Sequence, residues 1–113
     1  MTNLIIKEII GSSNAILRSS GASLYEIILS EIKINNKVVV DFIDIENLTS
    51  GFCNASFGKL AMEYKNAKEK IILQNVSSNI FEEKIYNSLS LSDKNDKKND
   101  LQSTDDAILD LFN

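Results

Sequence analysis

The stretch that most constrains the fold is residues 38–57, VVVDFIDIENLTSGFCNASF. A nearly continuous apolar, β-branched run contains Asp41 and leads into a short acidic segment, which ends in Thr49, Ser50 and Gly51. Apolar residues then return at the three- and four-residue spacing of a helix. This pattern predicts a buried strand, a tight polar loop and a helix that begins at Thr49 or Ser50. Because backbone N–H groups are free at a helix start, hydroxyls there are well placed to hold or receive a phosphate.

Two further strands are expected at residues 4–10 and 70–74, where isoleucine-rich runs are bounded by turn residues. A first helix is expected from Ser19 or Ser20 to Ile34, with Ser20 or Ser23 as its cap. A third helix is expected over residues 80–89, with Ser78 or Asn79 as its cap. The second helix should run from Ser50 or Phe52 to Tyr64. The expected buried stripes of the first and third helices are Leu24, Ile27, Ile28 and Ile32, and Ile80, Phe81, Ile85 and Leu89.

Strands that alternate with helices favour an α/β fold of order β-α-β-α-β-α with a mainly parallel sheet. The strand at residues 38–43 is expected to be central and covered on both faces, because its apolar run is nearly unbroken. The strand at residues 4–10 would then lie at an edge. An exposed edge can pair with a second copy, so a homodimer is one expectation.

The chain changes character after residue 91. Residues 1–91 carry the apolar segments of one domain, whereas residues 92–113 hold six acids and three lysines and so carry −3 of the net charge of −4. Residues 92–103 contain a single apolar residue, cannot bury enough surface to offset the entropy of ordering, and are expected to be disordered.

The composition removes most common enzyme classes. Histidine is absent and Cys53 is the only cysteine, so the usual zinc sites and Ser-His-Asp or Cys-His centres cannot be built. No phosphate-binding glycine motif of the P-loop or dinucleotide type occurs. Arg18 is the only arginine and the lysines are scattered, which disfavours nucleic-acid binding. The sequence shows no signal peptide and no apolar run of about 20 residues, so we expect a cytoplasmic protein that does not associate with a membrane. Because the residues of the common catalytic sites are missing, we also expect that it is not an enzyme and needs no cofactor.

The segment D-F-x-x-I-E-x-L-T-S-x-F, from Asp41 to Phe52, resembles STAS-like domains, the fold of anti-sigma-factor antagonists and sulfate-transporter tails. It is most similar to a divergent STAS-like group of unknown function found in bacteria and their mobile elements. Residues 4–89 take part in the resemblance. Within this segment Ile45 and Leu48 match, and beyond it Phe57, Gly58 and Leu60 match as well. Arg18 and residues 71–76 also fit.

The resemblance implies a regulatory protein–protein interaction module whose partner is an ATP-binding, histidine-kinase-like anti-sigma protein. In the antagonists such a kinase phosphorylates a serine at the helix start. Counted from Asp41, that serine falls on Gly51, one residue after Ser50. The phosphorylation site has therefore moved by one residue or been lost.

Each candidate site residue also has an ordinary structural explanation. Ser50 and Thr49 are phospho-acceptor candidates, or they only cap a helix. The carboxylates of Asp41, Asp44 and Glu46 could gather around a divalent metal, but more often such residues cap loops or face solvent, and we expect no metal. The candidate partner-binding residues of this region are Asp41, Asp44, Glu46, Leu48, Gly51, Phe52 and Asn54.

A cysteine, an arginine and three tyrosines elsewhere in the chain are also given structural interpretations. Cys53 is expected to be a small buried residue, although a thiol near a helix start can be reactive. Arg18 is expected to pair with a carboxylate across the first turn. The tyrosines Tyr25, Tyr64 and Tyr86 are expected to be half-buried at the rims of their helices.

A second candidate binding segment follows the acidic spacer, at Ile108, Leu109, Asp110, Leu111 and Phe112. Short apolar motifs on flexible tethers commonly dock in grooves of other proteins. The string L-D-L-F resembles the peptide Q-L-[SD]-L-F that binds the bacterial replication sliding clamp, with Ile108 in place of the glutamine. The alternative function is therefore a phage- or plasmid-type adaptor or inhibitor. The ordinary explanation of this segment is a terminal helix, because Ile108, Leu109 and Phe112 stand at helical spacing and could pack on the domain or on a second copy.

Overall fold

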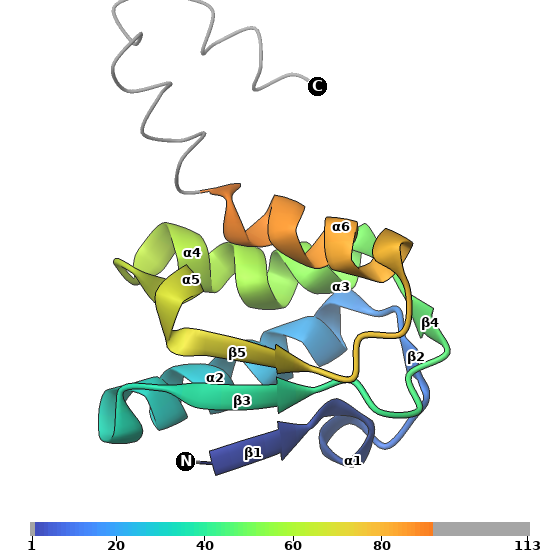
Figure 1. Cartoon of the computed structure of the whole chain (residues 1–113), viewed down its shortest axis with the longest axis horizontal. Coiled ribbons are helices and arrows are strands. Elements are labelled where there is room, and N and C mark those ends of the chain that lie inside the picture. The colour runs from blue at the N-terminus through green and yellow to red at the C-terminus, as the bar shows by residue number, and fades with distance from the viewer. Residues whose placement is uncertain (1, 92–113) are drawn as a thin grey trace, which may run out of the picture.

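The computed structural model describes residues 2–91, and the expected tail at 92–113 lies outside them. Three parallel strands form the main sheet in the order β1-β3-β5, namely β1 (Thr2–Ile5), β3 (Val38–Asp41) and β5 (Ile71–Gln74) (Figure 1). The helix α2 (Arg18–Asn35) connects β1 to β3. A second helical segment connects β3 to β5, and α6 (Asn79–Leu89) follows β5. The predicted α/β class, the parallel sheet and the central position of β3 are confirmed.

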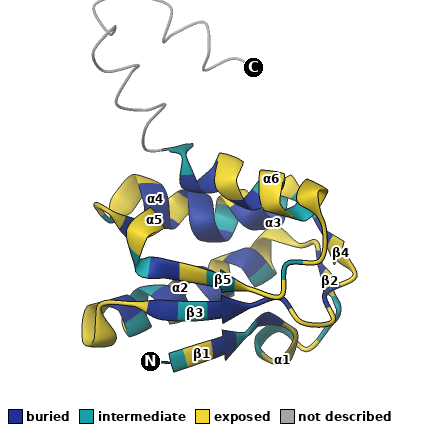
Figure 2. Cartoon of the chain, in the orientation of Figure 1, coloured by how far each residue is buried: buried dark blue, intermediate teal, exposed yellow. Residues whose placement is uncertain are grey.

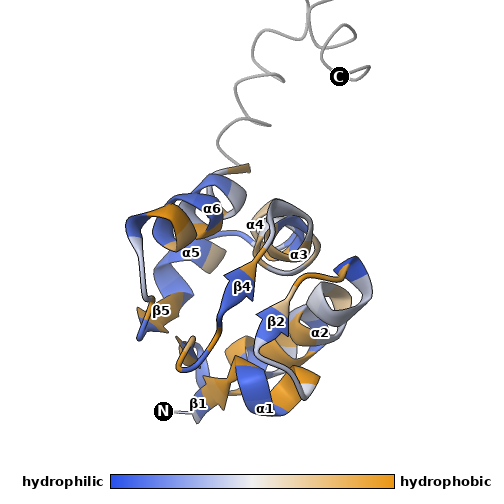
Figure 3. Ribbon diagram, turned by 90° about the vertical axis from the view of Figure 1, so that its right-hand side faces the viewer, coloured by the Kyte–Doolittle hydropathy of each residue, from blue (hydrophilic) through white to orange (hydrophobic). Residues whose placement is uncertain are grey.

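The sheet is covered by helices on one face only, which corrects the expectation of a strand buried on both sides. Because side chains alternate between faces along a strand, Val38 and Val40 point to one face and Val39 to the other. Val38 and Val40 are fully buried, whereas Val39 is half-buried and Ile72, its partner in the register, is 42% exposed. Figure 3, viewed toward the carboxyl ends of the strands, shows the helices gathered on one side of the sheet.

The first strand is shorter than its isoleucine-rich sequence suggested. Only Thr2–Ile5 is a strand, and Ile6–Ile10 forms the short helix α1. Ile5 pairs with Asp41, the last residue of β3, so a longer β1 would have no neighbour to bond. Gly11 closes α1 in the left-handed conformation at a φ of 71° and donates its N–H to the Lys7 carbonyl at 2.9 Å.

The helix α2 buries most of the stripe predicted for it. Leu24, Ile28 and Ile32 are buried, while Ile27 lies at the surface. Its start differs from the prediction, because Leu17 occupies the N-cap position and no side chain caps the helix. Asn36, at a φ of 67°, is the C-cap, so the helix ends at Asn35, one residue after the predicted end at Ile34. Tyr25 is buried rather than half-buried and donates a hydrogen bond to Glu63 at 2.6 Å.

The second helical segment is not a regular α-helix throughout. It consists of α3 (Ser50–Cys53), the π-helical turn η1 (Asn54–Gly58) and α4 (Lys59–Glu63), with Tyr64 at the C-cap. The start at Ser50 agrees with the prediction, whereas the π turn was not foreseen. The segment packs closely on α2, since a Cβ built on Gly21 would lie 2.6 Å from the Phe52 carbonyl oxygen.

The remaining elements close the domain. After α4 the chain forms α5 (Ala67–Lys70), a short helix that the sequence pattern did not predict. Ser78 caps α6 as predicted, accepting from the Phe81 N–H at 3.2 Å. Ile85 and Leu89 of α6 are buried and Phe81 is half-buried, but Ile80 is exposed, so the buried stripe is narrower than predicted (Figure 2). Tyr86, expected to be half-buried, is exposed. Within residues 2–91, no helix combines the length and the apolar character needed to cross a bilayer.

Candidate functional site

A second, two-stranded sheet lies beyond the carboxyl ends of the main strands (Figure 3). It pairs β2 (Asn14–Ala15) with β4 (Asn47–Leu48) in parallel. The N–H groups of Glu46 and Asn47 both donate to the Ser13 carbonyl, at 2.8 and 3.4 Å. The side-chain amide of Asn47 also donates a hydrogen bond to the side-chain oxygen of Asn14 at 2.6 Å. This small sheet holds the loop before α2 against the loop after β3, although the two are far apart in sequence.

Thr49 extends this connection by one residue and starts the following helix. Its N–H donates to the Ala15 carbonyl at 3.1 Å, and its Oγ1 donates to the Ile16 carbonyl at 2.8 Å. The same Oγ1 accepts from the Phe52 N–H at 3.1 Å, which is the N-cap interaction predicted for this residue. Because the hydroxyl of Thr49 both donates and accepts, it is committed to the structure.

Ser50 lies next to Thr49 but in a different environment. It is the first residue of α3 and is exposed. Within residues 2–91, no group forms a hydrogen bond with its hydroxyl. Of the two hydroxyls predicted as phospho-acceptor candidates, the one on Ser50 is therefore reachable from solvent without breaking a contact.

The residues just before α2 complete the surface around Ser50. Ile16 is 43% exposed and Leu17 is 62% exposed, and the Thr49 hydrogen bonds place both beside the loop. The Arg18 side chain lies over Gly51, since a Cβ built there would be 3.6 Å from Arg18 Cγ and 3.7 Å from Nε. We call residues 16–18 together with Ser50, Gly51 and Asn54 the corner surface. Asn54 is exposed and stands one turn after Ser50, so both share a helix face.

Sequence reasoning did not find Ile16 and Leu17 as candidates for binding. Two adjacent apolar residues before a helix are typical of a buried segment, and their exposure depends on the β2–β4 pairing. The carboxylate partner expected for Arg18 is also missing from the described part of the chain, where no acid lies within ion-pair distance of its guanidinium. Arg18 therefore presents an unpaired positive charge beside Ser50.

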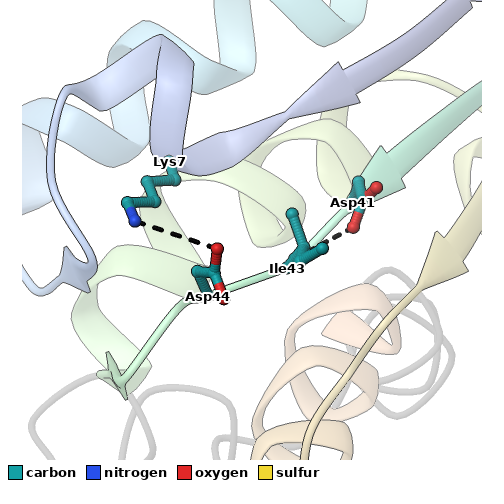
Figure 4. A network of polar contacts seen from close by, with 4 residues as sticks. All are labelled: Lys7, Asp41, Ile43 and Asp44. Carbon is teal, nitrogen blue, oxygen red and sulfur yellow. Dashed lines mark hydrogen bonds and ion pairs between the residues drawn. The ribbon is translucent and has the colours of Figure 1, made fainter.

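Three of the predicted partner-binding residues support the loop from below and do not reach its surface. Leu48 and Phe52 are buried in the core. Asp41 is also buried, and its Oδ1 accepts from the Ile43 N–H and from the Asn75 amide, each at 2.9 Å (Figure 4). A partner cannot contact these side chains directly. The prediction that they bind a partner is therefore corrected, since they support the structure of the loop.

The remaining acidic candidates, Asp44 and Glu46, are exposed. Asp44 adopts a φ of 60° and its carboxylate lies 3.9 Å from Lys7 Nζ, in a loose surface ion pair (Figure 4). Across residues 2–91, no three acidic or cysteine side chains converge in a way that could hold a metal ion. Asp41, Asp44 and Glu46 thus do not form the carboxylate cluster considered from the sequence.

Cys53 is buried as predicted, and its environment opposes reactivity. Burial raises the pKa of its thiol to about 12, although the nearby positive charge of Lys84 acts in the other direction. Lys84 itself donates to the Leu48 carbonyl at 2.8 Å and so lies beneath the corner surface. The possibility of a reactive thiol at the helix start is therefore wrong, because the helix buries this side chain.

A pocket of about 510 Å³ opens on another side of the same end of the sheet. Its charged side chains are Lys7, Glu8 and Asp44, and Ile5 and Ile43 supply apolar surface. All of these groups are at least partly exposed. The pocket therefore offers mixed charge in contact with water, with two carboxylates and one ammonium group.

A family model described as a STAS-like domain of unknown function (DUF4325) matches residues 20–81. The match runs from the first turn of α2 into α6 and includes β3, the Thr49–Ser50 loop and β5. Ile16, Leu17 and Arg18 lie outside it. Neither a curated protein nor a solved structure matches the chain.

Proposed function

Because the chain belongs to the STAS-like domains of unknown function, whose model matches more than half of it, we propose that it binds another protein through the corner surface. STAS-like domains typically serve regulation and are non-enzymatic. The finer proposal is that docking at the corner surface is the regulatory event. The proposal also assumes that the chain works in a reducing cytoplasm, where its single cysteine stays reduced.

The observation that carries the proposal is the contrast between Thr49 and Ser50. Four hydrogen bonds fix Thr49, two through its hydroxyl and two through its backbone, so the backbone of the corner is held in one geometry. Ser50 is exposed on that fixed corner, next to two exposed apolar side chains and one unpaired guanidinium. A preformed polar centre with apolar neighbours is a favourable arrangement for binding a protein, because little ordering is required on association.

Phosphorylation of Ser50 is the proposed switch. A phosphoryl group adds between about −1.5 and −2 charges at neutral pH. On Ser50 it would lie near Arg18 and at the start of a helical segment, where negative charge is favoured. The phosphate would neutralise the guanidinium and change the charge that a partner meets. The resemblance supports an ATP-binding, histidine-kinase-like anti-sigma protein as the partner that carries out this reaction.

Two measurements test the switch and the docking separately. Mass spectrometry of protein isolated from its host, with and without phosphatase, is expected to find phosphate on Ser50 and none on Thr49. Unmodified Ser50 in every growth state would remove the switch but leave the docking proposal intact.

Docking is tested by capture of a partner from host lysate with four full-length proteins. The wild type is expected to capture a partner, whereas the Leu17→Asp and Ser50→Glu variants are expected not to capture it. Asp is a favoured N-cap residue, so Leu17→Asp is expected to preserve α2. Ser30→Glu is the matched control, since Ser30 is exposed on α2 roughly 18 Å along the helix from Arg18. Equal capture by all four proteins would contradict docking at the corner surface.

The second candidate function uses the segment that contains Ile108, Leu109, Asp110, Leu111 and Phe112, which lies outside the described residues. Its resemblance to a clamp-binding peptide supports an adaptor or inhibitor of a replication protein. Removing residues 105–113 separates the two functions. A partner that survives the truncation and is lost with Leu17→Asp binds the corner surface, and one lost only with the truncation binds the terminal segment.

A further inference from the structure

The corner surface combines apolar and positively charged groups in a small area. Ile16 and Leu17, consecutive in the chain, are both exposed, and the guanidinium of Arg18 has no acidic partner within residues 2–91. A second cation, Lys84, reaches the Leu48 carbonyl directly before Thr49. Exposed apolar residues that lie next to unpaired charge favour a ligand that carries apolar groups and the opposite charge.

The same chain contains such a ligand. Residues 105–112, DDAILDLF, carry three aspartates and four large apolar residues without any lysine or arginine. We propose that this segment binds the corner surface of its own molecule and so masks it from the partner. The inference rests on the proposed function, since masking matters only if the corner surface is where the partner docks.

The charges of the corner surface differ from those of the pocket at this end of the molecule. The pocket between α1 and the loop after β3 presents Glu8 and Asp44 against one ammonium, that of Lys7. An acidic segment would be repelled there. At the corner surface Arg18 supplies an unpaired positive charge and Lys84 lies directly beneath, so the aspartates of residues 105–112 gain attraction.

The length of the intervening chain permits the contact. The side chain of Leu91, the last described residue, lies against η1, since a Cβ built on Gly58 would be 2.8 Å from its Cδ1. From there the corner surface lies toward the other end of α6, a helix roughly 16 Å long (Figure 1). Residues 92–104 can span roughly 45 Å when extended, so they reach it within one molecule. Tethering also makes this contact intramolecular, which raises its effective concentration.

The test uses NMR spectra of the isotopically labelled full-length chain. In one variant, Leu109→Ser and Phe112→Ser together remove two apolar side chains from the segment. We expect its amide signals to differ from those of the wild type at residues 16–18 and 49–54, whereas Leu101→Ser in the spacer should leave them unchanged. Adding a synthetic peptide of residues 104–113 to the double variant should move those signals back toward the wild type and reach saturation.

Three outcomes would overturn the proposal. The double variant could change signals only within residues 104–113, the peptide could shift signals at the pocket instead, or the wild type could sediment as a dimer that the double variant abolishes. The last outcome would show a second copy as the occupant.

Partner binding distinguishes the failure of masking from the failure of the proposed function. If the corner surface is free about a tenth of the time, the double variant should bind the captured partner about tenfold more tightly than the wild type. Equal affinity, with binding still lost in Leu17→Asp, would reject masking and leave the docking function standing. A partner that is insensitive to Leu17→Asp would reject the docking function, whatever the spectra show.

Discussion

The hydroxyl of Thr49 donates a hydrogen bond of 2.8 Å to the carbonyl of Ile16, a residue 33 positions earlier in the chain. This bond joins the start of α3 to the segment that leads into α2, and the neighbouring β2–β4 pair strengthens the connection. Two loops that are distant in sequence therefore form one surface. The position of Ser50 beside Leu17 and Arg18 depends on this connection.

Removal of the Thr49 hydroxyl is expected to destabilise the domain. Thr49→Val keeps the shape of the side chain but loses both the bond to Ile16 and the cap of the Phe52 N–H, at a cost of about 1–2 kcal/mol. Thr49→Ser retains a hydroxyl and should cost less. Urea unfolding followed by circular dichroism measures both, and equal stability of Thr49→Val and the wild type would contradict the assigned role.

Asp41 and Asp44 are expected to respond differently to the same substitution. Asp41→Ala removes a buried acceptor from the Ile43 N–H and the Asn75 amide, which should lower the free energy of unfolding by about 2–3 kcal/mol. Asp44→Ala removes only an exposed ion pair at 3.9 Å and should change it by less than about 0.5 kcal/mol. Thermal unfolding of the two variants in parallel gives the comparison. Similar losses would show that Asp41 does not have the structural role assigned to it.

Gly21, which faces the second helical segment from α2, and Gly51, which lies within that segment, provide another matched pair. Gly21→Ala would place a methyl group 2.6 Å from the Phe52 carbonyl oxygen, so α2 must shift and stability should fall by about 1–3 kcal/mol. Gly51→Ala meets Arg18 only at ordinary contact distance and should leave stability unchanged or raise it by up to about 1 kcal/mol. Denaturant midpoints report both effects. A tolerated Gly21→Ala would contradict the close packing of the two helical segments.

Stability is expected to fall at alkaline pH because of Cys53. An unfolded thiol loses its proton near pH 8.5, whereas burial raises the pKa of the folded thiol to about 12. The folded state therefore holds a proton that the unfolded state releases, and the stabilisation is fully present below about pH 8.5. Above that pH the free energy of unfolding should fall, by up to about 1.4 kcal/mol per pH unit, until the folded thiol ionises.

Cys53→Ala provides the control for this pH dependence. It removes the thiol and should give a shallower decline between about pH 8.5 and pH 10, below the range where tyrosines ionise. Urea unfolding at a series of pH values measures the slope for both proteins. Identical slopes would show that Cys53 ionises equally in the folded and unfolded states.

The order of strands and helices could be predicted because periodicity depends on local sequence. Leu24, Ile28 and Ile32 repeat at helical spacing, and Thr49 precedes a helix in the position of a cap. The features that were missed depend on distant partners. Residues 6–10 look like a strand, but β3 ends at Asp41 and leaves them nothing to pair with. Likewise, no local pattern marks Asn14–Ala15 as a strand, because its two residues gain their conformation from Asn47–Leu48.

The candidate site was predicted only in part for the same reason. The loop at Thr49 and Ser50 is visible in the sequence as turn chemistry before an apolar helix. The contribution of Ile16 and Leu17 is not visible, since their exposure follows from the hydrogen bonds of Thr49. Leu48 and Phe52 were predicted to bind a partner because they lie within the loop region, but both side chains are buried, since burial follows the side-chain direction and not the position in sequence.

Hydrogen exchange of the full-length chain with its captured partner tests docking at the corner surface most directly. The account predicts slower exchange on binding at the amides of residues 16–18 and 49–54, with little change at β1 or β5. Protection confined to the open face of the sheet, at Asn3, Val39 and Ile72, with unchanged exchange at Ser50 and Leu17, would contradict it.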